Sequence, residues 1–127
     1  MIGAYLCQAI QEAAQTAFPG VYVGLAQDNE RITLPAITLQ LRATSVVGSR
    51  LERGTLTVNV ASQADDSTPA EHAALVESVG DFMRTLTVST DKVYLAGLVS
   101  TDSDEMHAER HWQTPLTYIV GFTPSIL

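Results

Sequence analysis

Apolar residues at helical spacing mark the N-terminal segment. They recur at i, i+4, i+7, i+8 and i+11, which places them on one stripe of a helix over residues 3–17. The members of the stripe are Leu6, Ile10, Ala13, Ala14 and Ala17. Pro19 cannot continue the helical hydrogen bonds and Gly20 permits a turn, so the helix is expected to end just before them.

Strand patterns follow the first helix. Residues 21–25 form a short apolar strand candidate, and residues 36–42 and 54–62 both alternate between apolar and polar positions. A period of two predicts half-buried antiparallel strands, with residues 43–53 as the connection between them. Hairpin loops commonly have about two to five residues. A connection of this length therefore predicts an extended arm, a binding loop or a disordered tip.

The second helix has both a start signal and an apolar stripe. Thr68, Pro69 and Glu71 form a capping box, in which the threonine hydroxyl and the glutamate satisfy free amides of the first turn and proline occupies the first helical position. The stripe expected to face the core consists of Leu75, Val79, Phe82, Met83 and Leu86.

Two strand candidates lie near the C-terminal end. Residues 92–100 are apolar enough to predict a central strand with both faces covered. Residues 112–122 alternate, with Trp112, Leu116 and Phe122 among the residues that share a face. Pro115 lacks an amide proton, which places that point at a strand edge or a bulge. An acidic connection, residues 101–111, separates the two strands.

The element order α-β-β-β-α-β-β predicts an α+β fold. We expect a mostly antiparallel sheet with two helices packed on one face, a long β-hairpin loop, and one domain over residues 1–127. No segment approaches the roughly 20 apolar residues of a membrane span. The N-terminus lacks a basic segment before its apolar residues, so it resembles an amphipathic helix more than a signal peptide. We therefore expect retention in the cytoplasm of the producing cell.

Charge and cysteine content narrow the possible functions. The net charge is −7, with seven Lys plus Arg against fourteen Asp plus Glu, which argues against specific binding of nucleic acid. The basic residues Arg42, Arg50 and Arg53 nevertheless lie close together around an apolar centre, residues 46–48. The single cysteine, Cys7, excludes an intrachain disulfide, and its place in the helical pattern predicts a small buried or half-buried residue.

The patterns of catalytic and metal sites are weak. The acidic connection offers potential metal ligands, but residue 106 is Met and no glycine provides the turn of a calcium loop. A solvated acidic loop is the favoured interpretation over a metal site. The potential ligands are Asp102, Asp104, Glu105, His107, Glu109 and His111. His72, in the first turn of the second helix, is expected to be an exposed surface residue rather than a catalytic base. Without a nucleophile elbow, phosphate loop or dinucleotide motif, we predict neither an enzyme nor a cofactor.

The remaining signal is an asymmetry of charge. In one interpretation the basic and acidic connections are solvated turns. In the other, the basic connection of one copy meets an acidic surface of the next, and such a heterologous contact closes into a ring when it is repeated by rotation. The candidate interface residues are Arg42, Val46, Val47, Arg50, Arg53, Asp102, Asp104 and Glu105.

This element order resembles that of the tail terminator (tail completion) proteins of long-tailed bacteriophages. The resemblance covers nearly the whole chain. It is carried by the N-terminal helix, "LPAITLQL" (34–41), the long connection, "RGTLTVNVAS" (53–62), "AEHAALVESVGDFM" (70–83) and "ERHWQTPLTYIVGF" (109–122). It implies a structural protein of the virion tail, assembled in the host cytoplasm, that forms a hexameric ring.

The resemblance also implies partners for this ring. One face would contact the tail-tube protein and end its polymerisation, the other would dock the neck or connector, and DNA would pass through the ring. Residues 42–53 match the hairpin that contacts neighbours in that family, which has no catalytic residues. Two other functions stay open: a different head–tail joining protein, such as a neck or stopper protein, and a small-ligand-binding α+β domain.

Overall fold

A computed structural model describes residues 2–25, 35–45, 51–63, 69–101, 107–108 and 111–124. Within these ranges the predicted element order is present, with one short strand added inside the acidic connection. The elements are α1 (Ile2–Ala17), β1 (Tyr22–Leu25), β2 (Ala36–Ser45), β3 (Glu52–Gln63), α2 (Pro69–Arg84), β4 (Val93–Ser100), β5 (His107–Ala108) and β6 (His111–Pro124). The α+β fold predicted from the sequence is therefore confirmed.

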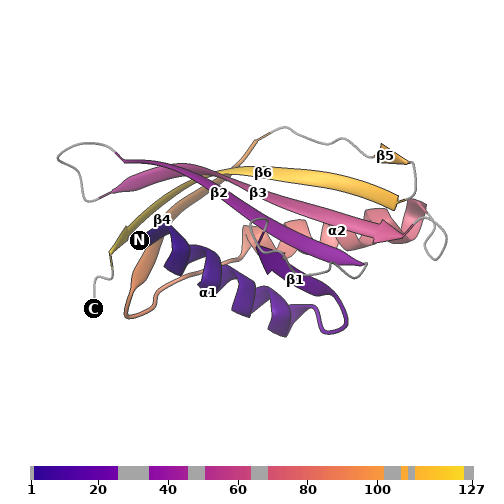
Figure 1. Cartoon of the computed structure of the whole chain (residues 1–127), viewed down its shortest axis with the longest axis horizontal. Helices are drawn as coiled ribbons and strands as arrows, with labels where there is room; N and C mark the ends of the chain where they lie inside the picture. Colours follow the sequence, from indigo (N-terminus) through magenta and orange to yellow (C-terminus); the bar gives the residue numbers. More distant parts are fainter. Residues whose placement is uncertain are drawn as a thin grey trace.

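The described strands form a single sheet with the order β1-β2-β3-β6-β4, and β5 pairs with one end of β6. Only the pairing of β1 with β2 is parallel among the described ladders, so the sheet is mostly antiparallel as expected. Both helices lie on the same face of the sheet (Figure 1). The other face, which we call the outer face, has no helix over it in the described part of the chain.

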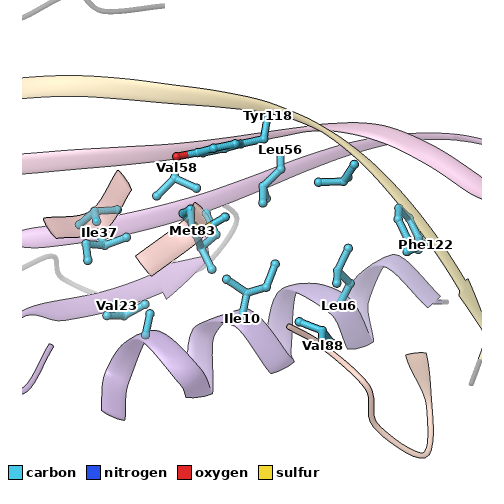
Figure 2. Close-up of a cluster of buried hydrophobic side chains, with 14 of the residues drawn as sticks. Leu6, Ile10, Val23, Ile37, Leu56, Val58, Met83, Val88, Tyr118 and Phe122 are labelled. Atoms are coloured by element: carbon cyan, nitrogen blue, oxygen red, sulfur yellow. The ribbon is translucent and has the colours of Figure 1, made fainter. Parts of the chain in front are cut away.

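The hydrophobic core lies between the helical layer and the sheet. Leu6 and Ile10 of α1 and Val79 and Met83 of α2 are all buried, as predicted. Ala17, at the end of the predicted stripe of α1, is exposed, and Leu86 lies beyond the end of α2. Figure 2 shows several of the buried helical side chains meeting those of the sheet. Full burial of one such side chain contributes about 1.5–3 kcal/mol. The buried residues that the sheet contributes include Val23, Ile37, Leu39, Leu56, Val58, Val60, Tyr118, Val120 and Phe122.

The hairpin differs from its prediction, because β2 and β3 are longer than their apolar patterns. The ladder continues to the pair Ser45↔Glu52, which leaves residues 46–51 between the strands instead of residues 43–53. At its first residue, β3 is also held by its other neighbour, because Glu52 pairs with Phe122 of β6. Backbone pairing thus extends the strands past the point at which alternation fades. Arg53, predicted in the connection, is a strand residue, and Arg42 lies in a strand as predicted.

The prediction that residues 92–100 form a central strand is wrong. β4 lies at the edge of the sheet, where its ladder is with β6 and an isolated bridge joins Tyr94 to Ser89 on its other side. The exposed fraction of the Val99 side chain is 63%, and Ala96 and Gly97 are exposed as well. The strand is apolar on both faces although only its inner face is covered.

β6, in contrast, lies inside the sheet between β3 and β4. Pro115 is in register with Asn59 of β3. On the other side of β6, the β4 ladder stops at Tyr118 and the β5 ladder at Gln113, so Pro115 falls between them. A residue without an amide proton suits this position, in agreement with the expectation that Pro115 marks a local edge.

Two further predictions concern the helices. Pro69 is the first residue of α2 as predicted, whereas Thr68 lies outside the described residues. Cys7 is buried as predicted, and burial raises the pKa of its thiol. In the described part of the chain, neither helix has the length and apolar content that a membrane crossing requires.

Candidate functional site

The sheet brings two of the predicted interface arginines together on its outer face. Arg42 of β2 is in register with Thr55 of β3, and Arg53 is two residues before Thr55 on the same strand. Both arginines are exposed. Residues in this diagonal relation lie roughly 7–8 Å apart. The two arginines are therefore neighbours on the sheet because of strand register, whereas the sequence predicts Arg53 in the connection.

An exposed apolar pair continues the same row across the sheet. Thr55 is in register with Ile119 of β6, and Ile119 is in register with Val99 of β4. The exposed fractions of the Ile119 and Val99 side chains are 50% and 63%. We call this set of five residues the outer strip: Arg42, Arg53, Thr55, Val99 and Ile119.

The sequence predicts the two arginines of the outer strip as interface residues, but it does not predict the two apolar residues, Val99 and Ile119. Val99 was assigned to a covered strand, so its exposure was not expected. Ile119 lies on the polar side of the alternating β6 pattern, between Thr117 and Gly121. An isoleucine at this position could have indicated an exposed apolar contact. An apolar side chain in the polar phase of an alternating strand indicates a face that meets something other than water.

The arginines of the outer strip have no intramolecular counter-charge among the described residues. The ion pair that this part of the structure contains joins Arg84 to Asp81, 3.0 Å apart on α2. Exposed carboxylates of the described chain include Glu77 and Asp81, which lie on the helical side of the molecule. Two like charges side by side on an acidic protein form a local site that favours an anionic partner.

The other predicted interface residues cannot be compared with the outer strip. Val46, Val47 and Arg50, together with Asp102, Asp104 and Glu105, lie outside the described residues. Within the described residues no group of three or more His, Cys, Asp or Glu side chains is arranged to hold a metal ion. His107 belongs to strand β5 and pairs with Gln113, so the connection is not one continuous loop as predicted.

The expectation that His72 is exposed is wrong, because only 1% of this residue is accessible. Its Nδ1 lies 2.9 Å from the Ser62 hydroxyl of β3, and its Nε2 lies 3.0 Å from the Thr114 hydroxyl of β6. The sequence contained the signal for burial: His72 precedes Leu75 by three residues and Val79 by seven. It therefore extends the apolar stripe of α2 backwards by one turn.

The His72 cluster links three elements. In the neutral imidazole one ring nitrogen donates to a hydroxyl and the other accepts from one, so both polar ends are satisfied. Burial lowers the pKa of His72, which favours this neutral form. A serine beside a histidine is also the pattern of an activated nucleophile, but Ser62 is only 2% accessible and has no opening to a substrate here. The cluster fastens the start of α2 to β3 and β6.

Two open surface hollows of the described chain lie beside α1. One has a volume of about 190 Å³ and a mixed polar and apolar lining, in which the ammonium of Lys92 lies 5.9 Å from the centre of the Tyr5 ring. Glu12, Asp91 and Lys92 are exposed at its rim. The hollow has no buried polar group directed into it, unlike a typical small-molecule site.

Comparisons with known proteins bear on the fold. No family model matches the chain, and no curated protein sequence matches it. A solved structure, whose description states neither an activity nor a partner, superposes with a TM-score of 0.60 at 14% sequence identity. The match covers 99% of this chain and 94% of that one. At this identity the likeness supports the α+β architecture over the whole chain.

Proposed function

We propose that this chain is a structural protein of the tail terminator class: copies form a ring that caps the phage tail tube, ends its polymerisation and docks the head or neck. The element order is one support, since the order implied by the resemblance also describes this fold. A second support is the length of β2 and β3, which form a hairpin of 10 and 12 residues.

The observation that carries the proposal is the outer strip. A ring protein needs contact surfaces rather than a reaction centre. The outer strip combines exposed Val99 and Ile119 with two arginines on a face that no described helix covers. Arginine is enriched among the residues that contribute most of the energy of protein contacts, and exposed apolar side chains that lie together mark sites of association. The buried polar cluster at His72 is by contrast closed to any substrate.

The test is whether the purified protein limits tube growth. The tube-forming protein of the same phage is polymerised with and without this chain, and tube lengths are measured by electron microscopy. We expect shorter tubes with a ring at one end, and fewer long tubes as the ratio of this chain to tube protein rises.

The control separates capping from a general effect of acidic protein. An unrelated protein of similar size and net charge, added at the same concentration, is expected to leave tube length unchanged. Tubes that grow to the same lengths with and without this chain would overturn the proposed function.

A further inference from the structure

We propose that the outer strip of one copy binds the solvent-facing side of α2 in a second copy of this chain. The inference deepens the proposed function and rests on it, since a ring requires that copies associate. It names the two surfaces that meet, and neither the fold nor the comparisons assign them.

The first argument is the unbalanced charge of the outer strip. Arg42 and Arg53 are diagonal neighbours on β2 and β3, and no described carboxylate pairs with either of them. Their mutual repulsion is relieved when a surface with two carboxylates approaches. In a protein of net charge −7, another copy offers such surfaces at the same concentration as the strip itself.

α2 presents a surface with the required charge spacing. Glu77 and Asp81 are both exposed and four residues apart, so they lie on one side of the helix about 5–6 Å from each other. This separation is close to that of the two arginines across the strands. Asp81 does pair with Arg84, but the side chains of the pair are 58% and 75% exposed, and a pair in water exchanges partners at little cost.

The shape of α2 also suits a flat sheet. The exposed residues next to Glu77 are small, namely Ala70, Ala73, Ala74 and Ser78. A helix with such short side chains can approach Val99 and Ile119 closely, so that the exposed apolar pair is covered. Charge would then fix the direction of the helix across the strands, and apolar contact would fill the centre.

The placement of the two surfaces determines what kind of assembly forms. The outer strip lies on the outer face of the sheet, whereas α2 belongs to the layer on the opposite face (Figure 1). One copy therefore cannot satisfy its own strip, and each contact leaves a free strip and a free α2 for the next copies. A heterologous contact of this kind closes into a ring when the rotation permits.

The experiment is a charge exchange read by sedimentation velocity and light scattering over a range of concentrations. Variant one is Arg42→Glu with Arg53→Glu, variant two is Glu77→Arg with Asp81→Arg, and variant three combines all four changes. We expect each double variant to associate roughly 10- to 100-fold more weakly than the natural chain. The fourfold variant, which restores opposite charges at the contact and keeps the net charge of −7, is expected to regain association.

A control variant and a fold measurement accompany the exchange. Lys92→Glu reverses an exposed charge on the helical side, next to α1, and is expected to associate like the natural chain. Circular dichroism and the midpoint of thermal unfolding check that all variants remain folded. For any double variant that unfolds, the neutral substitutions Arg53→Gln and Glu77→Gln replace the reversals, each with a smaller expected loss.

The outcomes distinguish the inference from the proposed function. Natural association in both double variants, or no rescue in the fourfold variant, would overturn the contact while leaving tube capping intact. A chain that is monomeric both alone and on tubes would overturn the contact as well.

Association through the strip by a chain that does not limit tube length would uphold the contact and overturn the proposed function. Loss of DNA binding in the arginine variant, with association unchanged, would assign the strip to nucleic acid instead.

Discussion

Nε2 of His72 lies 3.0 Å from Oγ1 of Thr114, a contact that joins the first turn of α2 to the first part of β6. The two residues are 42 positions apart in the chain, so the hydrogen bond forms only when α2 is seated on β6. Ser62 bonds to the other nitrogen of the same ring, so the attachment of the start of α2 to the sheet depends on one buried side chain, that of His72.

Replacement of this histidine is therefore expected to be costly. His72→Ala leaves a cavity and two buried hydroxyls without their partner, and should lower the free energy of unfolding by about 2–4 kcal/mol. Urea denaturation followed by circular dichroism measures the change. Ser78→Ala, on the exposed side of the same helix, is the control and should stay within about 0.5 kcal/mol of the natural protein.

A second variant tests whether the unpaired hydroxyls of Ser62 and Thr114 cause this loss of stability. Replacing all three polar groups, as His72→Leu with Ser62→Ala and Thr114→Val, removes the unsatisfied hydroxyls as well as the imidazole. This triple variant should be more stable than His72→Ala, because buried polar groups cost most when only one partner is removed. If it is the less stable of the two, the unpaired hydroxyls of Ser62 and Thr114 are not the cause of the loss in His72→Ala.

Stability should depend on pH through His72. Burial lowers its pKa below the ordinary value of 6.5, so the unfolded chain binds a proton more readily than the folded protein. The contribution of neutral His72 is fully present above pH 6.5 and is lost as the pH falls from there towards the pKa of the folded state. Denaturation curves between pH 5 and 8, roughly the range in which histidine titrates, are expected to show this loss in the natural chain. The loss should be absent from the triple variant, in which carboxylates titrate unchanged.

Two glycines are expected to respond to alanine in opposite ways. Gly20 has a φ of 88°, in the region that disfavours a side chain, so Gly20→Ala should destabilise the protein by roughly 1 kcal/mol. Gly80 lies inside α2, and a Cβ added there meets no atom within 4 Å. Gly80→Ala should stabilise by about 0.5–1 kcal/mol, because alanine lowers the entropic cost of forming the helix. The midpoint of thermal unfolding of each variant measures the change in stability. Shifts of both midpoints in the same direction would contradict the explanation from local geometry.

Cys7 should react slowly with thiol reagents. It is buried on α1, and its raised pKa keeps the thiol protonated near neutral pH. We expect labelling in the folded state to be limited by opening of the structure and to become fast in denaturant. The rate of absorbance change with an aromatic disulfide reagent measures it. Rapid labelling of the native protein would show that α1 detaches easily from the sheet.

The sequence predicted those parts of the fold that depend on local pattern. Leu6, Ile10, Val79 and Met83 were placed in the core because helical spacing alone brings them to one side. The ends of β2 and β3 were missed because pairing with β6, and not alternation, carries them past Leu41. Strand pairing between distant segments leaves no trace in a short window of sequence.

The candidate site was only partly predictable for a related reason. Arg42 and Arg53 were recognised by their charge in an acidic chain, but their adjacency required the register of two strands. Val99 was misplaced because an apolar residue on an uncovered face has the same sequence pattern as a buried one. His72 was misplaced because a polar residue is ordinarily assigned to solvent, and its two hydroxyl partners come from other elements.

The strand order has a consequence for synthesis and folding. β6 is the last described strand along the chain, yet it occupies the sheet between β3 and β4. While a ribosome is still making residues 111–124, β4 has no described ladder partner and the core lacks Tyr118, Val120 and Phe122. The sheet and the core of the emerging chain therefore stay incomplete until β6 inserts between β3 and β4. A fragment that ends before residue 111 does not contain the whole described sheet.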